Sequence, residues 1–262
     1  TRTRLICIGG ASNLTGTIND VKSICAIARA AGALSYIDGV QSAPHIATDV
    51  QDLNCDFFVC SAYKFFGPHQ GILWGRRDVL ERLDAYRVRP AGSEIPWCFE
   101  TGTQSHEGIA GVAATVNYFA SIGATLASDG RGGPAELTGR RRDVRNAMHM
   151  LFEYEQELAL YLIAGLQAID GVTVQGISAP DAMDRRVPTV SFTHSAVAPA
   201  TIAEGLARQN IFVWSGHNYA VEAAKALRVL DSGGVVRVGP VHYNSLDEID
   251  ALLGALPPLL AA

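Results

Sequence analysis

Short apolar runs and a helical pattern alternate through the first 75 residues, and this alternation constrains the fold more than any other feature of the chain. Apolar runs at residues 5–8, 33–37 and 56–60 each have the length of a buried strand. A fourth run at 71–75 predicts a strand that returns beside the third. This β-α-β order favours a mostly parallel sheet covered by helices, in which ligands bind outside the carboxyl ends of the strands.

A helix is expected between the first two runs. Apolar residues recur at helical spacing from Val21 to Ala28, and Gly32 is placed to end the helix. Asn19 is the predicted N-cap, because an amide side chain accepts a hydrogen bond from the first helical turn.

The second half of the chain predicts a smaller α/β domain. The glycine-rich stretch 128–134 favours a boundary, so that residues 1–127 belong to a large domain and 128–262 to a small C-terminal one. Helices are expected over 108–122, 144–169 and 201–209, with a last helix opened by the capping box Ser245–Glu248. Strands are expected at 172–175, 187–193, 211–214 and 235–238.

Composition excludes several classes of function. The chain has 262 residues, 48% hydrophobic, and a net charge of −5, and its densest basic cluster, Arg140–Arg142, is typical of a solvated helix face. Nucleic acid is therefore not an expected partner. Five scattered cysteines without C-x-x-C spacing indicate reduced thiols in a cytoplasmic protein and no metal site. No apolar stretch is expected to cross a membrane, and the start does not resemble a signal peptide.

Three side chains of complementary chemistry follow the predicted strands. Lys64 comes just after the run 56–60, Ser61 precedes it by three positions, and Asp38 ends the previous strand. A lysine amine, a carboxylate and a hydroxyl suit a cofactor that carries an aldehyde, a ring nitrogen and a phosphate. That description fits pyridoxal phosphate (PLP). An amine beside apolar residues is expected to be buried and to lose its proton more easily.

Five motifs in order resemble the class V aminotransferases, the branch of PLP enzymes that contains cysteine desulfurases, selenocysteine lyases and isopenicillin N epimerase. The resemblance spans nearly the whole chain, and the motifs are Ser12–Ile18, Asp38–Ser42, Ser61–Pro68, Phe99–Thr103 and Arg237–Asn244. It implies the aspartate aminotransferase-like fold of PLP-dependent transferases, with a mostly parallel large domain and a smaller α/β domain. A dinucleotide-binding domain is excluded, because no G-x-G-x-x-G follows the first strand.

The resemblance assigns roles around the cofactor ring. Lys64 would form the Schiff base and move protons at the substrate α-carbon. Asp38 would pair with the ring nitrogen, although an aspartate before Gly39 is also common in turns. Gln41 would bind the phenolic oxygen of the cofactor and Asn13 would lie near the same oxygen or the substrate, although either could be an ordinary loop amide.

The remaining assignments concern the phosphate and the substrate. Ser61 would bind the phosphate, and Tyr63 stands where many desulfurases have a histidine but can still donate a hydrogen bond. Thr103 resembles the threonine that reaches the phosphate of a neighbouring subunit, which implies a homodimer with a shared active site. Arg237 resembles the arginine that binds the substrate α-carboxylate, the alternative being a strand arginine in a surface ion pair.

Two departures from the family pattern limit the function. Desulfurases carry sulfur on a mobile cysteine after a Gly-His-His sequence, and here Tyr219 stands at that place, behind Gly216 and His217. Because a phenol forms no persulfide, His217 and Tyr219 are interpreted as substrate contacts or loop-packing residues. The second departure is a missing segment before the Asn13 motif, so the N-terminal portion of the fold is expected to be absent.

The sequence therefore predicts a PLP-dependent enzyme acting on a small amino acid, with transaminase, lyase or epimerase chemistry left open. Two alternatives remain. One is a PLP-fold protein that binds without turnover, and the other is a true cysteine desulfurase despite Tyr219.

Overall fold

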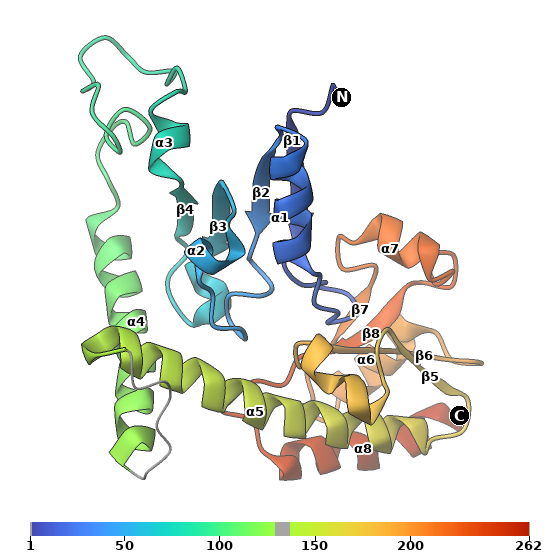
Figure 1. The fold of residues 1–262 in the computed structure, drawn as a ribbon. Helices are drawn as coiled ribbons and strands as arrows, with labels where there is room; N and C mark the ends of the chain where they lie inside the picture. The colour runs from blue at the N-terminus through green and yellow to red at the C-terminus, as the bar shows by residue number, and fades with distance from the viewer. Residues whose placement is uncertain (1, 129–136, 262) are drawn as a thin grey trace. The chain divides into compact units, whose positions relative to one another are not determined.

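Two compact units make up the chain in a computed structural model (Figure 1). The structure describes residues 2–128 and 137–261. The first unit contains residues 1–10 and 20–148, and the second contains residues 11–19 and 149–262. The predicted domain boundary after residue 127 stays a prediction, since most of the glycine-rich stretch that carries it lies outside the described residues.

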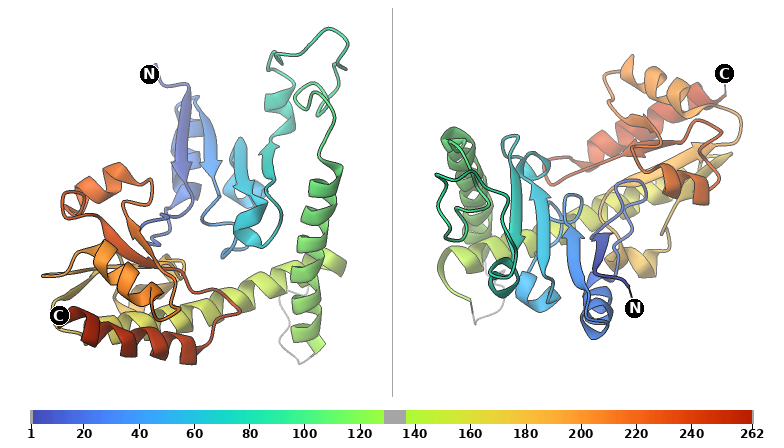
Figure 2. Two further views of the ribbon diagram at one scale, coloured as in Figure 1. Left: turned by 180° about the vertical axis from the view of Figure 1, so that it is seen from behind. Right: turned by 90° about the horizontal axis from the view of Figure 1, so that it is seen from above.

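The first unit is built on a four-stranded sheet. Strands β1 (Leu5–Gly9), β2 (Leu34–Asp38) and β3 (Phe57–Ser61) are parallel, and β4 (Gly71–Gly75) returns antiparallel to β3. The strands lie in the order β1-β2-β3-β4, which the view from above in Figure 2 shows side by side. The mostly parallel sheet and its returning strand are as the sequence predicts.

Helix α1 (Val21–Ala30) begins one residue later than its predicted cap implies. Asp20, not Asn19, is the N-cap, because its carboxylate accepts a hydrogen bond from the Ser23 backbone N–H at 3.1 Å. The helix packs on β2 and β3 through a cluster that includes Cys25 and Phe58. Cys25 and Cys55 are buried in this cluster, as expected for thiols within apolar runs.

Further helices of this unit follow the sheet. They are α2 (Val50–Leu53), the 3-10 helix η1 (Ala62–Phe65), α3 (Arg77–Leu80), α4 (His106–Ser128) and α5 (Gly139–Gln167), which continues into the second unit. Sequence patterns missed α2, η1 and α3, since one helical turn is too short to show a period. Helix α4 extends beyond its predicted bounds at both ends, whereas α5 begins five residues earlier and ends two residues earlier than predicted.

Helix α4 is apolar and little buried. Among the residues that the structure describes, it alone is long and apolar enough to cross a membrane, over His106–Ala127. This corrects the expectation that no stretch is long enough. Only 17% of its most apolar window is buried. One such helix is weak support for a membrane span, because core helices pass the same test.

The second unit contains an antiparallel sheet in the order β5-β6-β8-β7. Its strands are β5 (Val172–Gln175), β6 (Val190–His194), β8 (Val235–Val238) and β7 (Trp214–Gly216). The strand expected over 211–214 is wrong except at Trp214. The backbone N–H of Ile211 instead donates to Leu206 O at 3.1 Å, which closes the preceding helix α6 (Pro199–Ala207).

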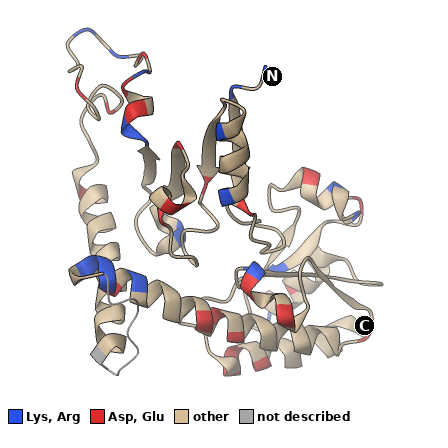
Figure 3. Ribbon diagram, in the orientation of Figure 1, with Lys and Arg blue, Asp and Glu red and all other residues tan. Residues whose placement is uncertain are grey.

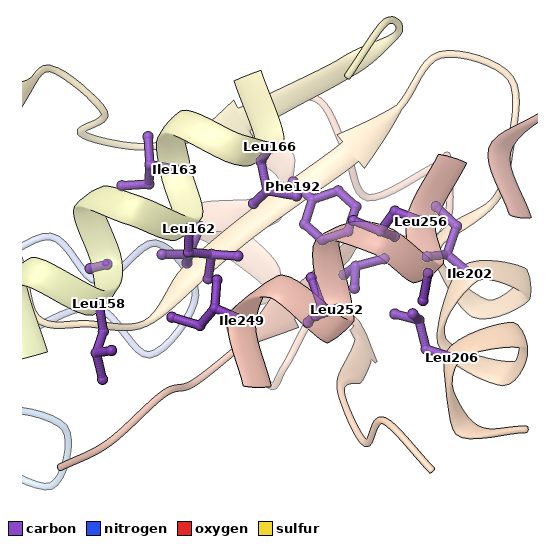
Figure 4. Close-up of a cluster of buried hydrophobic side chains, with 14 of the residues drawn as sticks. Leu158, Leu162, Ile163, Leu166, Phe192, Ile202, Leu206, Ile249, Leu252 and Leu256 are labelled. Carbon is purple, nitrogen blue, oxygen red and sulfur yellow. The ribbon is translucent and has the colours of Figure 1, made fainter. Parts of the chain in front are cut away.

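Each face of this second sheet has its own core. Helices α5, α6 and α8 (Leu246–Leu260) cover one face through buried residues such as Leu162, Phe192 and Leu252 (Figure 4). The opposite face packs Val235 against Leu14 and α7 (Val221–Ala226). A capping box formed by Ser245 and Glu248 opens α8, as the sequence predicts. A further 3-10 segment, η2 (Pro180–Arg185), precedes β6.

Candidate active site

The carboxyl edge of the first sheet brings together the ends of β2 and β3. Asp38 is the last residue of β2 and pairs in register with Val59, so β3 runs two residues further to Ser61. The exposed carboxylate of Asp38 accepts a hydrogen bond from the Val40 backbone N–H at 2.9 Å. This bond holds the carboxylate at the strand end, where parallel sheets bind ligands.

Lys64 lies in the 3-10 helix that directly follows Ser61. Its Nζ atom is 5.3 Å from the centroid of the Tyr63 ring, which itself stacks on His69 with ring centroids 4.9 Å apart. A hydrogen bond of 2.9 Å from the Gly67 backbone N–H to Ala62 O closes this turn. Ala62 faces the core while Lys64 and Tyr63 are exposed. The expected burial of the Lys64 amine is therefore wrong for the described chain.

Two glycines allow close packing where β1 and β2 end. A Cβ atom at Gly39 would lie 2.0 Å from the Phe58 ring, and one at Gly10 would lie 2.4 Å from Ser42 Oγ. The Gly10 backbone N–H also donates to Asp38 O at 2.8 Å. Half-buried Gln41 lies in the turn that starts at Gly39. The close packing of Gly39 and Gly10 therefore constrains the position of Gln41 next to the end of β2.

Thr103 lies apart from the sheet edge, in the loop before α4. It is exposed and follows Gly102, whose φ of 85° lies in the left-handed region. Its role toward a neighbouring subunit stays a prediction. The described residues contain no group of three or more His, Cys, Asp or Glu that could hold a metal ion.

In the second unit, Asn13 and Arg237 are directly bonded. Arg237 Nη1 donates to the Asn13 carbonyl oxygen at 2.9 Å, and Asn13 Nδ2 donates to Asn218 O at 2.8 Å. Burial lowers the pKa of the Arg237 guanidinium from its ordinary value. Arg237 is half-buried and bonds a carbonyl, and its role toward a substrate carboxylate stays a prediction.

His217 and Tyr219 flank Asn218 in the turn after β7. Both are exposed, and the Tyr219 backbone N–H donates to His217 Nδ1 at 3.2 Å. Tyr219 is 93% exposed and has a φ of 62°, so its ring contributes little packing within its own unit. The role of His217 and Tyr219 toward a substrate stays a prediction.

Two buried polar residues that hold the Asn13 segment, Arg186 and Ser191, were not predicted from the sequence. No local signal indicates the burial of Arg186, because Asp184 and Arg185 precede it directly and such a charged run is typical of a surface. A hollow of about 650 Å³ in the first unit was not predicted either. It lies beside the arginines at the start of α5, which are blue in Figure 3. Its lining includes Arg140, Arg141 and Asp49.

Comparisons with known proteins agree on one family. The family model for class V aminotransferases matches residues 1–130 and 145–252. A probable cysteine desulfurase of Halalkalibacterium halodurans is 31% identical over 267 residues, covering 97% of this chain and 58% of the relative. The aminotransferase-like protein FGM3 of Gibberella zeae is 31% identical over 263 residues, covering 99% of this chain and 60% of that protein.

Solved structures support the same fold. The apo structure of a cysteine desulfurase from Thermococcus onnurineus NA1 matches with a TM-score of 0.81 at 25% identity, covering 98% of this chain and 60% of that one. The chain thus spans about three fifths of the length of its relatives. The predicted fold and the PLP cofactor of the family are confirmed. The chain belongs to the class V aminotransferases, a family of PLP-dependent enzymes.

Proposed function

We propose that the whole protein is a PLP-dependent enzyme that acts on an amino acid through Lys64. The observation that carries this proposal is the placement of Asp38 and Lys64 at the ends of neighbouring parallel strands. A protein that had lost catalytic activity would have no chemical reason to keep an acid and a lysine at the ligand-binding edge of the sheet. The proposal therefore ranks above a PLP-fold protein that binds without turnover.

The residues at this edge fit PLP in chemical type. The Asp38 carboxylate suits the ring nitrogen, and the Gln41 amide suits the phenolic oxygen. The hydroxyls of Ser61 and Tyr63 can donate hydrogen bonds to the phosphate. When bound, PLP supplies an electron sink for negative charge at the substrate α-carbon. Asp38, held by its bond from Val40, would keep the ring nitrogen protonated.

Lys64 is the lysine suited to hold the cofactor. The sequence has three lysines, and the other two lie on helices in exposed ion pairs, Lys22 with Asp52 at 2.6 Å and Lys225 with Glu222 at 2.7 Å. Lys64 instead follows a strand end on a closed turn. Its neutral amine can take a proton from the substrate α-carbon and return one.

Arg237 is proposed to bind the substrate α-carboxylate. Its planar guanidinium has five N–H donors, and the bond to Asn13 O uses one of them. That bond fixes the rotation of the guanidinium, so the remaining donors present a defined edge to a carboxylate. Exposed His217 and Tyr219 would contact the variable part of the substrate.

The reaction class is proposed to be transamination, elimination or epimerisation at the α-carbon rather than desulfuration through a persulfide. Tyr219 occupies the turn where a desulfurase cysteine would stand, and no cysteine follows Cys98 in the sequence. The names of the relatives favour true cysteine desulfuration as a second candidate. The whole protein is further proposed to be a cytoplasmic homodimer in which Thr103 reaches the partner's phosphate site.

The test uses the full-length protein. Borohydride reduction followed by peptide mass spectrometry should find the cofactor on Lys64, and Lys64→Ala should remove it. Lys22→Ala, which breaks only an exposed ion pair, should keep the cofactor and serves as the matched control. A panel of amino acids is then scored for keto acid, racemised product and sulfide. Cofactor retained covalently in Lys64→Ala would contradict the proposal, and sulfide release from cysteine would favour the second candidate.

A further inference from the structure

Three consecutive backbone carbonyls of the Asn13 segment each accept a hydrogen bond from a different buried or half-buried side chain. Arg237 Nη1 donates to Asn13 O, Ser191 Oγ donates to Leu14 O, and Arg186 Nη2 donates to Thr15 O. We name this set the carbonyl ladder. Residues 13–15 belong to the second unit, and the carbonyl ladder fixes them there through three side chains that are remote in sequence.

The strand register explains why two of these side chains point the same way. Ser191 on β6 and Arg237 on β8 lie directly opposite each other on neighbouring antiparallel strands, so their side chains share one face of the sheet. Their neighbours Phe192 and Val236 face the opposite side and join the core under α5, α6 and α8. The Asn13 segment thus lies on the face that Ser191 and Arg237 present.

Arg186 is the third member of the carbonyl ladder and, like Ser191, is fully buried. It is 0% exposed, and its other acceptors are also backbone carbonyls, those of Ile177, Val187 and Thr189. Burial lowers the pKa of its guanidinium to about 10, which still leaves it charged at neutral pH. A buried charge is costly unless its donors are satisfied, so the carbonyls around Arg186 are held in a fixed arrangement.

The backbone next to Arg186 adds further constraints on the same segment. The Val187 N–H donates to Gly16 O at 2.8 Å, and the Ile18 N–H donates to Arg185 O at 2.9 Å. Gly16 has a φ of 76°, and a Cβ atom there would lie 2.4 Å from Thr189 O. The segment therefore has no room to shift toward the sheet.

We propose that Arg186 is a positioning residue for the carboxylate-binding arginine. By holding Thr15 O it fixes the backbone two residues before it, and Asn13 O in turn orients Arg237. Without the hydrogen bond from Arg186 to Thr15 O, Asn13 O can move and the Arg237 guanidinium can rotate. The inference rests on the proposed function, since it concerns how Arg237 receives the substrate carboxylate.

The test compares Arg186→Lys and Ser191→Ala with the control Arg185→Lys in the full-length protein. Arg185 is exposed and supports the segment only through its backbone carbonyl, so its side chain is dispensable to the ladder. Ser191→Ala removes an uncharged donor and keeps the inference testable if Arg186→Lys does not fold. Both ladder variants should raise KM for the amino acid about tenfold with kcat nearly unchanged, and the control should match wild type.

Two further readouts separate positioning from general destabilisation. Amide exchange of the Ile18 N–H should be faster in the ladder variants at temperatures where they remain folded. Arg186→Lys combined with Arg237→Lys should raise KM no more than Arg237→Lys alone, because both act through one interaction. Additive effects, or a lower Tm with an unchanged KM, would overturn the inference. A wild-type protein that binds no amino acid would instead contradict the proposed function.

Discussion

Arg237 and Asn13 are 224 positions apart in the sequence, yet Arg237 Nη1 donates to the Asn13 carbonyl oxygen at 2.9 Å. This bond attaches residues 11–19, which belong to the second unit, to strand β8 of that unit's own sheet. The contact uses a backbone acceptor, so it constrains where Asn13 lies whatever its side chain does. The acceptor is a carbonyl and not a carboxylate, so this bond leaves the charge of Arg237 available for the proposed binding of a substrate carboxylate.

Arg237→Lys is expected to raise KM for the amino acid by at least about tenfold and to change kcat less. An ammonium group has no planar fork, so it is unable to hold Asn13 O and a carboxylate in the same geometry. Steady-state kinetics measures the effect. Arg208→Lys, at the exposed end of α6, is the matched control and should behave as wild type. Equal KM values for both variants would remove Arg237 from carboxylate binding.

Asp38→Asn is expected to lower kcat by about 100-fold or more while the cofactor remains bound to Lys64. The asparagine Oδ1 can still accept the hydrogen bond from Val40 N–H, so the turn is retained and only the negative charge is lost. Turnover, the bound-cofactor absorbance and Tm are measured together. A variant with wild-type turnover would show that Asp38 serves only the turn.

Local sequence patterns predicted the elements that have an internal period or a side-chain cap. The parallel strands and the capping box at Ser245 are of this kind. The patterns failed where a partner remote in sequence decides the outcome. Strand β7 starts at Trp214 because it pairs there with Arg237, and no pattern in residues 211–214 encodes that register.

The candidate site shows the same division. Lys64, Asp38 and Arg237 could be chosen from the sequence, because their chemistry and their place after or within apolar runs are visible in it. Arg186 and Ser191 could not, since each acts through a backbone carbonyl that folding brings near. The exposure of Lys64 likewise depends on which way the 3-10 turn points its side chain.

Gly39→Ala is expected to destabilise the protein by about 1–3 kcal/mol. Its Cβ atom would lie 2.0 Å from the Phe58 ring, which is packed between α1 and the sheet and is unable to move away freely. Urea unfolding measures the loss. Gly71→Ala in the same sheet meets no atom within 4 Å and is the control. Equal stabilities for the two variants would show that Phe58 can repack.

Asp49→Asn is expected to lower stability at neutral pH by about 0.5 kcal/mol. Asp49 caps α2, and the N–H donors of Asp52 and Gln51, together with Arg141 and Arg145, hold the pKa of its carboxyl below the usual value. Asparagine keeps the cap but has no charge.

The sign of the pH effect follows from that lowered pKa. The stabilisation is complete above the ordinary pKa of 3.8 and is lost as the pH falls through the lower folded-state value. The gap between wild type and Asp49→Asn in urea unfolding should therefore close on acidification. A gap that stays constant down to low pH would show that the charge of Asp49 does not contribute.

Turnover is expected to be insensitive to iodoacetamide in the native protein. Cys25, Cys55 and Cys98 are buried, and burial raises the pKa of the Cys55 thiol to about 11, so its reactive thiolate is scarce at neutral pH. Exposed Cys7 should react first, with no loss of activity, and all five cysteines should react after unfolding. Peptide mass spectrometry and an amino acid assay on the same sample measure both. If the protein releases sulfide from cysteine and alkylation abolishes that release, the protein is a cysteine-dependent desulfurase. Tyr219 would then not determine the reaction class.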